Sequence, residues 1–386
     1  MCNFSIPSAM SKIIVLGAGM VGKAIAIDLS AKHRVISADI DQESLNFLSA
    51  NYPIETQGVN LMEEERVAAL VKDCDLVVSA VPGFMGHDIL RTVIEAGKNI
   101  VDISFMPEDY MKLNALAAQK GVTAITDCGV APGMPNLIVG YHNELMEIEN
   151  FEYVVGGLPR IKIYPFFYKA PFSPIDVIEE YTRPARFIEK GQLLTKPAMS
   201  EPELMFFEKV GTLEAFYTDG LRSLLFNMEH IPNMREKTLR YPGHIQLILA
   251  LKTAGFFEKT PITINNTAIR PIDFTSKVLI DDWKLGRNEP EFTVMRIEIS
   301  GKQEGVHRKI VYDLYDEYDP EAKLSSMART TGFTATACAE LVLQNRFSGK
   351  GVFPPELLGM DPDGFRFVMD YLAERKVKYN KTESTM

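Results

Sequence analysis

A glycine-rich segment near the start of the chain has the residue types and spacing of a phosphate-binding loop. Gly17, Gly19 and Gly22 form the pattern G-x-G-x-x-G directly after the β-branched run at residues 12–16, and a helical pattern follows. The first glycine permits a tight turn, the second lets the backbone approach a pyrophosphate, and the third lets helix and strand pack closely. The N-terminus of the helix offers N–H groups and partial positive charge to the phosphate. The residues expected at the nucleotide are Gly17, Ala18, Gly19, Met20, Val21 and Gly22.

An acidic residue at the end of the next expected strand indicates which dinucleotide the loop would take. Asp39 follows Gly22 by 17 residues, close to the roughly 20 at which a carboxylate holds the ribose hydroxyls. Its negative charge would repel a 2′-phosphate, and the surrounding "ADIDQES" offers no Lys or Arg to bind one. The sequence therefore predicts NAD rather than NADP. A glycine turn that binds no ligand is the alternative.

Polar residues also end the later strands that the first third of the chain predicts. Asp102 lies near the end of "KNIVDIS" and Asp127 ends "VTAITD". Ligands of open parallel sheets bind outside the carboxyl ends of the strands, so we expect both carboxylates to act in catalysis. A helix cap or a loop hydrogen bond is the alternative for each. Further cofactor contacts are expected at Ser79, Ala80, Val81 and Ser104.

The patterns around these residues indicate the fold that must position them. Strands and helices alternate through the first third, as in a doubly wound parallel sheet, whereas residues 151–157 and 293–318 alternate apolar with polar, as in strands with one covered face. We expect an α/β protein with a Rossmann-type doubly wound parallel sheet and a second α/β domain with a mixed or antiparallel sheet. The expected division is a dinucleotide-binding domain at 1–129, a substrate-binding and dimerisation domain at 130–322, and a C-terminal helical segment at 323–386 that returns to the first domain.

The stretch "DCGVAPGMPN" joins the last parallel strand to the next helix. Pro132 stiffens the chain, and Gly133 permits a turn that other residues disfavour. The following helix is expected to begin there, so the stretch is predicted to be the hinge between domains and a wall of the active site.

Composition excludes several other classes of protein. The 386 residues carry a net charge of −10, which argues against a nucleic-acid partner. Residues 1–9 are expected to be a short extension without a secretion signal, and no apolar window is long enough for a membrane span. The spacing of the cysteines fits neither a zinc site nor a disulfide framework, so no metal is expected. We expect reduced thiols and a cytoplasmic location. They are Cys2, Cys74, Cys128 and Cys338.

Several longer motifs occur in an order that resembles the saccharopine dehydrogenase-like superfamily, and within it the L-lysine dehydrogenases of the lysine 6-dehydrogenase type. They are "IIVLGAGMVGKAIAIDL", "IVDISFMPE", "DCGVAPGMPNLIVGY", "YVVGGLP", "YTRPAR", "EAFYTDGLRSLL", "LRYPGH", "MARTTGFTATA" and "GVFPPE". Ala131 stands where saccharopine-forming members tend to have an acid in G-x-D-P-G, which favours the lysine dehydrogenase branch. The resemblance implies NAD-dependent oxidative deamination of the ε-amino group of L-lysine to the 6-semialdehyde, which cyclises to a piperideine carboxylate.

Such an amino-acid substrate needs cations for its carboxylate and groups that accept protons. Arg222 and Arg240 lie in motifs that match the family and are the candidates for the carboxylate; an ion pair to a nearby acid is the alternative for each. His244 is the candidate proton acceptor, since the pKa of a free histidine suits work near neutral pH. Asp219 is expected near the amine and Tyr168 along the aliphatic stem.

Two other functions stay open. A saccharopine or carboxynorspermidine-type dehydrogenase would need a larger pocket and extra cations for additional carboxylates. The second alternative is a protein that binds NAD but does not catalyse its reduction. A homodimer is expected by analogy with other two-domain dehydrogenases.

Overall fold

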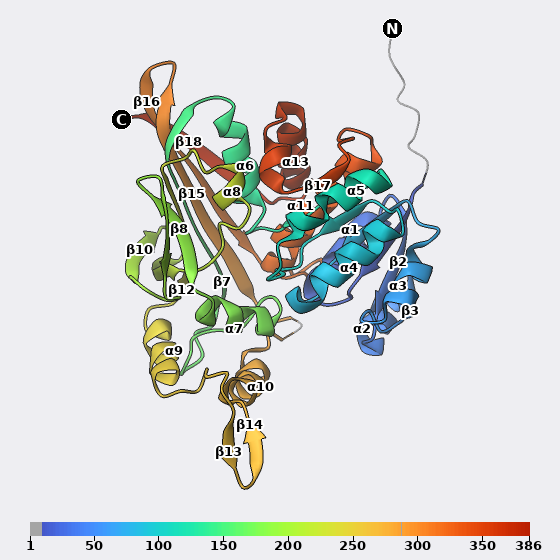
Figure 1. The fold of residues 1–386 in the computed structure, drawn as a ribbon, viewed down its shortest axis with the longest axis horizontal. Coiled ribbons are helices and arrows are strands. Elements are labelled where there is room, and N and C mark those ends of the chain that lie inside the picture. Colours follow the sequence, from blue (N-terminus) through green and yellow to red (C-terminus); the bar gives the residue numbers. More distant parts are fainter. Residues whose placement is uncertain (1–9, 287) are drawn as a thin grey trace. The chain divides into compact units, whose positions relative to one another are not determined.

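The computed structural model describes residues 10–286 and 288–386 and divides into two compact units (Figure 1). Unit 1 comprises the chain up to Leu137 together with Thr331–Arg375, and unit 2 comprises Ile138–Thr330 with Lys376–Met386. Helices α6, Met134–Asn143, and α11, Ser326–Leu343, each begin in one unit and end in the other. Cys2 and the expected extension at residues 1–9 lie outside the described residues.

Unit 1 contains a seven-stranded parallel sheet with the order β17-β6-β5-β4-β1-β2-β3. Its first six strands follow the 3-2-1-4-5-6 order of dinucleotide-binding folds, whose switch point lies between β1 and β4. Every residue from Ile13 to Leu16 is fully buried, so both faces of the sheet are covered, as the continuous apolar run predicts. The strands are β1 Lys12–Leu16, β2 Arg34–Asp39, β3 Ile54–Gly58, β4 Leu76–Ser79, β5 Ile100–Asp102, β6 Thr123–Ile125 and β17 Gly351–Phe353.

The helices of unit 1 supply the apolar side chains that bury this sheet. Val67, Leu90 and Ala117, from α3, α4 and α5, share one core with Ile14 and Val77 of the strands. The expected Rossmann-type α/β fold is therefore confirmed. The remaining elements are α1 Met20–Ser30, α2 Gln42–Asn51, α3 Glu64–Val71, α4 Gly83–Glu95, η1 Tyr110–Leu113, α5 Asn114–Lys120, α12 Pro355–Gly359 and α13 Pro362–Glu374.

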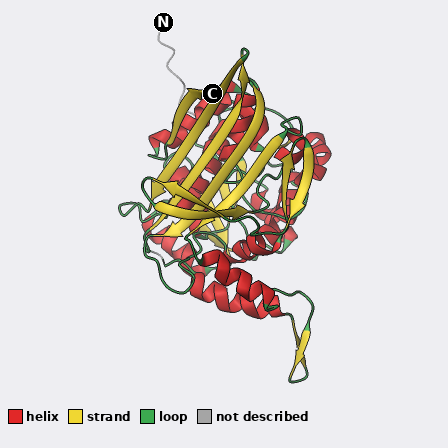
Figure 2. Ribbon diagram, turned by 90° about the vertical axis from the view of Figure 1, so that its left-hand side faces the viewer, coloured by secondary structure: helices red, strands yellow, loops and turns green. Residues whose placement is uncertain are grey.

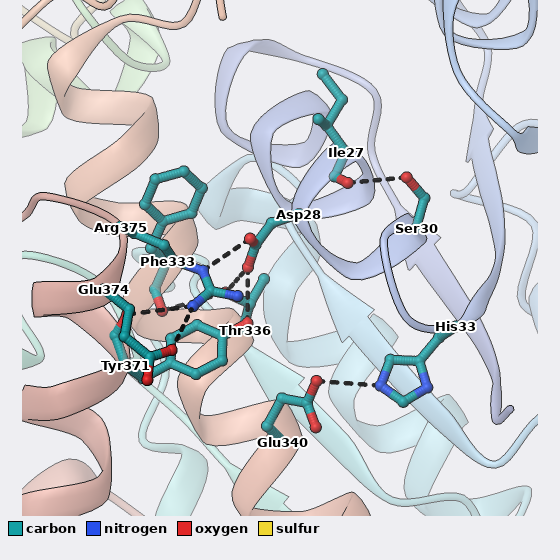
Figure 3. Close-up of polar contacts among 10 residues, drawn as sticks. All are labelled: Ile27, Asp28, Ser30, His33, Phe333, Thr336, Glu340, Tyr371, Glu374 and Arg375. Carbon is teal, nitrogen blue, oxygen red and sulfur yellow. Dashed lines mark hydrogen bonds and ion pairs between the residues drawn. The ribbon is translucent and has the colours of Figure 1, made fainter. Parts of the chain in front are cut away.

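A polar cluster fastens α1 to the C-terminal helices of unit 1 (Figure 3). Asp28 of α1 accepts hydrogen bonds of 2.7 Å from the Thr336 and Tyr371 hydroxyls and from Nε of Arg375. Beside it, a Cβ added to Gly332 of α11 would lie 3.3 Å from the Ile25 side chain, so the two helices pack closely. The small residues of "MARTTGFTATA" thus allow the packing against the first helix that the sequence predicts.

Unit 2 is built on a large mixed sheet, shown in yellow in Figure 2. Its main path runs β10-β11-β12-β7-β15-β16-β18, and β8 and β9 extend from β12. Among the strand pairs that the described residues form in this sheet, the β12–β7 pair is parallel and the others are antiparallel. The expected mixed sheet is therefore confirmed. The strands are β7 Glu147–Pro159, β8 Ala185–Glu189, β9 Gln192–Lys196, β10 Glu203–Phe207, β11 Gly211–Tyr217, β12 Asn233–Arg240, β15 Glu291–Gln303, β16 Val306–Glu317 and β18 Tyr379–Thr385.

Strand β18 differs from the sequence prediction for the end of the chain. A helical segment was expected to residue 386, but α13 ends at Glu374 and residues 379–385 pair with β16 of the mixed sheet. The stretch "KYNKTEST" alternates too weakly to reveal a strand, and its six residues after Tyr379 are exposed. Backbone pairing with β16, and not burial of side chains, holds these residues in a strand.

Four helices and one small hairpin complete unit 2. Trp283 of α10, Tyr181 of α7 and Ile245 of α9 share an apolar core with Leu239 of the sheet. The β13–β14 hairpin projects beyond α10 in both ribbon views (Figures 1 and 2). These elements are α7 Pro174–Thr182, α8 Leu224–Asn227, α9 His244–Thr253, α10 Pro271–Trp283, β13 Ile262–Ile264 and β14 Thr267–Ile269. Among the helices of residues 10–286 and 288–386, none is long and apolar enough to cross a membrane.

Candidate functional site

The glycine loop of unit 1 has the backbone geometry that its spacing predicts. The Gly17 amide donates to the Ala38 carbonyl at 2.8 Å, which joins the loop to β2. A Cβ on Gly22 would lie 2.0 Å from the Gly17 carbonyl oxygen, so only glycine fits there. A Cβ on Gly19 would meet nothing within 4 Å, and no side chain caps the helix that begins at Met20. The loop therefore leaves open space at the N-terminus of α1, where a phosphate would bind.

Asp39 is connected to the same loop by hydrogen bonds. Its Oδ2 accepts from the Ala18 amide at 2.6 Å, and its Oδ1 accepts from the Asp41 amide at 2.9 Å. The carboxylate at the end of β2 thus stabilises the loop that follows β1. Its contact with a ribose stays a prediction, and its contact with the loop is a role that the sequence argument did not foresee.

The ends of β4 and β5 bring several expected cofactor residues together. Ser79 and Asp102 are opposite each other in the parallel register. The Ala80 amide donates to the Leu16 carbonyl at 2.8 Å, and the Ala80 carbonyl oxygen would lie 2.5 Å from a Cβ on Gly17. Val81 follows in a buried position. These residues line the β1–β4 switch point, where nucleotides bind in folds of this kind.

Asp102 is a fully buried acid close to the strand ends. Its Oδ2 accepts hydrogen bonds from the amide and the hydroxyl of Ser104, at 3.0 and 2.7 Å. Burial raises the pKa of Asp102 to about 7, the Ser104 hydrogen bond opposes that shift, and the negative charge of Asp127 adds to it. Because its charge changes near neutral pH, Asp102 can hold or release a proton during a reaction.

Asp127 lies two residues beyond β6, in a left-handed conformation with a φ of 54°. The Tyr110 hydroxyl donates to its Oδ2 at 2.7 Å, and both groups are buried. The next residue, Cys128, donates its amide to the Asp102 carbonyl at 3.1 Å, so the two acids share one region of unit 1.

Burial raises the pKa of the Cys128 thiol well above its usual value, and the thiol is therefore not a nucleophile at neutral pH.

The Gly-Val-Ala-Pro-Gly turn forms as the sequence predicts. Gly133 has a φ of 141°, and a Cβ there would lie 1.9 Å from the Gly129 carbonyl oxygen. The Gly129 amide donates to the Pro132 carbonyl at 3.0 Å, and α6 begins at the next residue after Gly133, Met134. The turn thereby connects the last strands of unit 1 to the helix that leads into unit 2.

Two arginines of unit 2, Arg183 and Arg222, interact electrostatically, and Glu179 lies 3.6 Å from the Arg183 guanidinium. Arg222 is 7% exposed and has a φ of 54°, directly after the turn that follows β11. Burial lowers the pKa of Arg183, and the neighbouring positive charge of Arg222 lowers it further. Two partly desolvated guanidinium groups near each other are favourable for a carboxylate, because bidentate hydrogen bonds to such an anion are strong.

Asp219 does not have the role expected from the sequence. Its two carboxylate oxygens accept from Nε and Nη2 of Arg186, both at 2.9 Å. A carboxylate held by a guanidinium in this bidentate manner is already compensated. Asp219 therefore orients the segment around Arg222 and does not fit an independent contact to the amine of a substrate.

Arg240 also departs from the expected substrate contact. Its guanidinium lies in the interior of unit 2, where it donates to Glu180 at 2.5 Å, to the Tyr181 hydroxyl at 3.1 Å and to the Leu239 carbonyl at 3.0 Å. The Tyr168 ring lies 4.3 Å from the Arg240 guanidinium carbon and is itself buried. Arg240 thus forms the alternative ion pair, and Tyr168 belongs to the core rather than to a substrate channel.

His244 does not fit the proton acceptor expected from the sequence. It is 1% exposed, and its two ring nitrogens lie 2.8 Å from the Phe166 carbonyl and 2.9 Å from the Tyr181 hydroxyl. Burial lowers the pKa of His244 to about 3, and the nearby charge of Arg240 adds to the effect. The ring stays neutral and hydrogen-bonded at neutral pH, which is a structural role.

Two further residues, Arg183 and Glu236, belong to the surroundings of Arg222 and were not predicted from the sequence. Arg183 lies in the quoted motif "YTRPAR" but was not selected, although two arginines three positions apart are a signal for an anion site. Glu236 lies in β12, where "NMREKTLR" gives no sign that its carboxyl group turns inward, yet it is 3% exposed. Its hydrogen bonds connect it to the turn that carries Arg222.

Matches to two domain models cover most of the chain and decide its family. Residues 13–125 match the saccharopine dehydrogenase NADP binding domain, and residues 129–377 match the saccharopine dehydrogenase C-terminal domain. The chain belongs to the saccharopine dehydrogenase family. The glycine loop, Asp39 and Asp102 of this family member fall in the first model, and Asp127 lies between the two.

Curated relatives of this saccharopine dehydrogenase family member include longer proteins. The mitochondrial alpha-aminoadipic semialdehyde synthase of Rattus norvegicus is 26% identical over 280 residues, which are 65% of this chain and 29% of the relative. The saccharopine dehydrogenase [NADP(+), L-glutamate-forming] of Pyricularia oryzae is 25% identical over 288 residues, 70% of this chain and 63% of the relative. The chain thus spans less than a third of the first protein's length.

A solved structure of the family has the same fold. The apo saccharopine dehydrogenase (L-Glu forming) from Saccharomyces cerevisiae superimposes with a TM-score of 0.78 at 18% sequence identity, and the match covers 97% of this chain and 100% of that one. At this identity the likeness concerns the fold, and it agrees with the Rossmann-type sheet and the mixed sheet described above.

Proposed function

We propose that this chain is a nicotinamide-dependent dehydrogenase of an amino-acid carbon–nitrogen bond, and that its substrate carries more than one carboxylate, as saccharopine does. In this proposal unit 1 binds the nucleotide and unit 2 binds the substrate. The observation that carries it is a pair of arginines in unit 2 whose charges interact: Arg222 is buried, and Arg183 is half-buried.

A single α-carboxylate needs one arginine, whereas a substrate condensed from two amino acids has further carboxylates to bind. Arg183 and Arg222 repel each other, and the carboxylates of Glu179 and Asp219 offset part of this repulsion. A polyanionic substrate would relieve it, and its carboxylates would form charge-assisted hydrogen bonds in a partly desolvated region. The names of the fungal and yeast relatives agree with this substrate class.

The residues of unit 1 support NAD as the nucleotide. Asp39 places negative charge at the end of β2, where a 2′-phosphate would otherwise bind, and none of the residues 38–44 is basic. The matching domain model is described as NADP-binding, so the charge of Asp39 is the observation that separates this chain from that description. Isothermal titration with NADH and NADPH tests the preference: tighter binding of NADPH would overturn the choice of NAD.

The chemistry needs one hydride acceptor, one proton acceptor and water. The nicotinamide, when bound, accepts the hydride from the carbon next to nitrogen. Before that transfer the substrate ammonium must lose a proton to a base or to water. Loss of the hydride leaves a protonated imine, and water then hydrolyses the carbon–nitrogen double bond to an amine and a carbonyl compound with release of a proton. Arg183 and Arg222 would orient the substrate through its carboxylates.

The experiment is a comparison of coenzyme reduction with saccharopine, L-lysine and diamines, with NAD⁺ and NADP⁺ in turn. The proposal predicts the highest kcat/KM with saccharopine. A rate with diamines, which have no carboxylate, equal to that with saccharopine would overturn it. No reduction by any of these compounds, together with tight NADH binding, would support a protein that binds the nucleotide without turnover.

L-lysine is the second candidate substrate, and a separate observation favours it. Ala131 replaces the acid that saccharopine-forming members tend to have in G-x-D-P-G. Oxidative deamination of the ε-amino group would give the 6-semialdehyde, which cyclises, and ammonia. A kcat/KM for lysine above that for saccharopine would decide for this candidate. The homodimer and the cytoplasmic location stay predictions from the sequence.

A further inference from the structure

We propose that Glu236 is a positioning residue for substrate binding, because it fixes the turn Thr218–Arg222 so that Arg222 is held ready for a substrate carboxylate. The inference rests on the proposed function, since it assigns a support to the arginine that would bind the substrate. Glu236 belongs to β12, and the turn follows β11, so the contact joins neighbouring strands of the mixed sheet.

The carboxyl group of Glu236 is connected to the turn at two points. The Thr218 hydroxyl lies 2.8 Å from Oε1 and 2.7 Å from Oε2, and the Gly220 amide donates to Oε2 at 3.0 Å. The Thr218 hydroxyl is also 2.7 Å from that of Thr238, which follows in β12. Thr218, Glu236 and Thr238 are all buried, so water does not replace these hydrogen bonds in the folded chain.

The turn and the carboxyl group are fitted to each other sterically. A Cβ on Gly220 would lie 2.6 Å from the Glu236 carboxyl carbon, so the side chain occupies the space that any other residue would need. On the other side, the Tyr153 hydroxyl donates to the Gly220 carbonyl at 2.8 Å. Asp219, between them, is held by Arg186. Each of the three residues from Thr218 to Gly220 is therefore fixed by a side chain from another segment.

Arg222 needs this support because of its backbone conformation. With a φ of 54° it adopts the left-handed region, which costs a non-glycine residue about 1–2 kcal/mol. Such a conformation persists only where the surroundings enforce it, and it often marks a functional position. Thr218 and Gly220, which hydrogen-bond Glu236, lie four and two residues before Arg222 in the chain. Loss of the Glu236 carboxyl group would let the turn relax and would move the guanidinium away from the anion.

Burial of Glu236 indicates which substitution preserves its role. Desolvation raises the pKa of Glu236 to about 8, and the hydrogen bond from Thr218 opposes the shift. A carboxyl group that is mostly neutral at pH 7 resembles the carboxamide of glutamine in charge and shape. Glu236→Gln keeps an oxygen acceptor for the turn, whereas Glu236→Ala removes it.

The test compares Glu236→Ala, Glu236→Gln and the control Glu214→Ala. Glu214 is a similarly buried acid, 6% exposed, in the neighbouring strand β11, and hydrogen-bonds Gln246 instead of the turn. We expect Glu236→Ala to raise KM for saccharopine at least 10-fold, with the Kd for NADH within about 2-fold of the unsubstituted protein. Glu236→Gln should restore KM to within about 3-fold, and Glu214→Ala should leave it unchanged. Equal KM values for all variants would overturn the inference, as would an equal rise for Glu214→Ala.

Hydrogen exchange of the turn separates failure of this inference from failure of the proposed function. If the unsubstituted protein oxidises neither saccharopine nor lysine, the proposed function fails, and the amides of residues 218–222 then decide the inference. Faster exchange there in Glu236→Ala, but not in Glu236→Gln or Glu214→Ala, supports the positioning role. Unchanged exchange in Glu236→Ala overturns it.

Discussion

The two units build their candidate sites from different parts of the chain. In unit 1 the nucleotide loop is mostly main chain: three glycines within six residues set its shape, and a hydrogen bond from the Ala18 amide to the Asp39 carboxylate completes it. In unit 2 the candidate anion site consists of side chains, and Arg183 and Arg222 come from separate segments. A site made of local backbone can be read from the sequence, whereas a site made of distant side chains depends on the register of the sheet.

The units also bury charge differently. Asp102 of unit 1 is an acid supported by a serine, and its pKa is shifted to about 7. Arg240 of unit 2 is buried with a carboxylate partner, Glu180, and a tyrosine hydroxyl. A group with a shifted pKa is suited to proton transfer, whereas a buried ion pair is compensated and serves the fold. Substitutions at these positions should therefore affect different properties.

The largest expected effect is on stability, from Arg240→Met. The substitution leaves the half-buried Glu180 without its partner, and breaking a buried pair in this way costs up to about 3–5 kcal/mol. Urea unfolding followed by circular dichroism measures it, and the double variant Arg240→Met with Glu180→Gln should recover much of the loss. A decrease of less than about 1 kcal/mol in the free energy of unfolding would contradict a structural role for Arg240.

Arg222→Ala should change substrate binding more than stability. Loss of one charge-assisted contact to a carboxylate costs about 1.5–3 kcal/mol, so KM for saccharopine should rise roughly 10- to 150-fold. The Kd for NADH should stay within about 2-fold, because the nucleotide loop belongs to unit 1. Arg186→Ala is the comparison, since Arg186 is paired with Asp219. Equal changes in KM and in the Kd for NADH would mean that Arg222 holds structure instead.

Asp39→Ala should weaken NADH binding about 10-fold, through the lost ribose contact and the lost hydrogen bond to the loop. Asp39→Asn keeps an acceptor for the Ala18 amide and separates the two contributions. Isothermal titration measures both variants. Unchanged affinity in Asp39→Ala would remove this residue from the nucleotide site.

A further expected effect is on the pH dependence of stability in Asp102→Asn. The folded pKa of Asp102 is raised to about 7 from an ordinary value of 3.8, so the folded state binds the proton more tightly than the unfolded state. The protein therefore loses stability through Asp102 as the pH rises from about 4 to about 7. Asp102→Asn lacks this loss, and its Tm relative to the unsubstituted protein should increase by a few degrees over that range. A constant difference in Tm would contradict the shifted pKa.

Most of the fold follows from local patterns, and most of the errors concern side chains. The strands β1, β2, β4, β5 and β6 of unit 1, the glycine loop and the turn at Gly133 were predicted because their signals lie within a few residues. His244 and Arg240 were selected because their type suggests chemistry, while the groups that hydrogen-bond them, Phe166, Tyr181 and Glu180, lie about 60–80 residues away in the sequence. Glu236 was missed for the same reason, since only pairing of β11 with β12 brings it near Thr218.

The most direct test of the proposed substrate class is the ratio of kcat/KM for saccharopine to that for L-lysine, measured with NAD⁺ before and after the double substitution Arg183→Ala and Arg222→Ala. We predict a ratio well above one for the unsubstituted protein and a fall of at least 10-fold in the double variant. A ratio below one, or a ratio that the double substitution leaves unchanged, would contradict a site in unit 2 that selects substrates by their carboxylates.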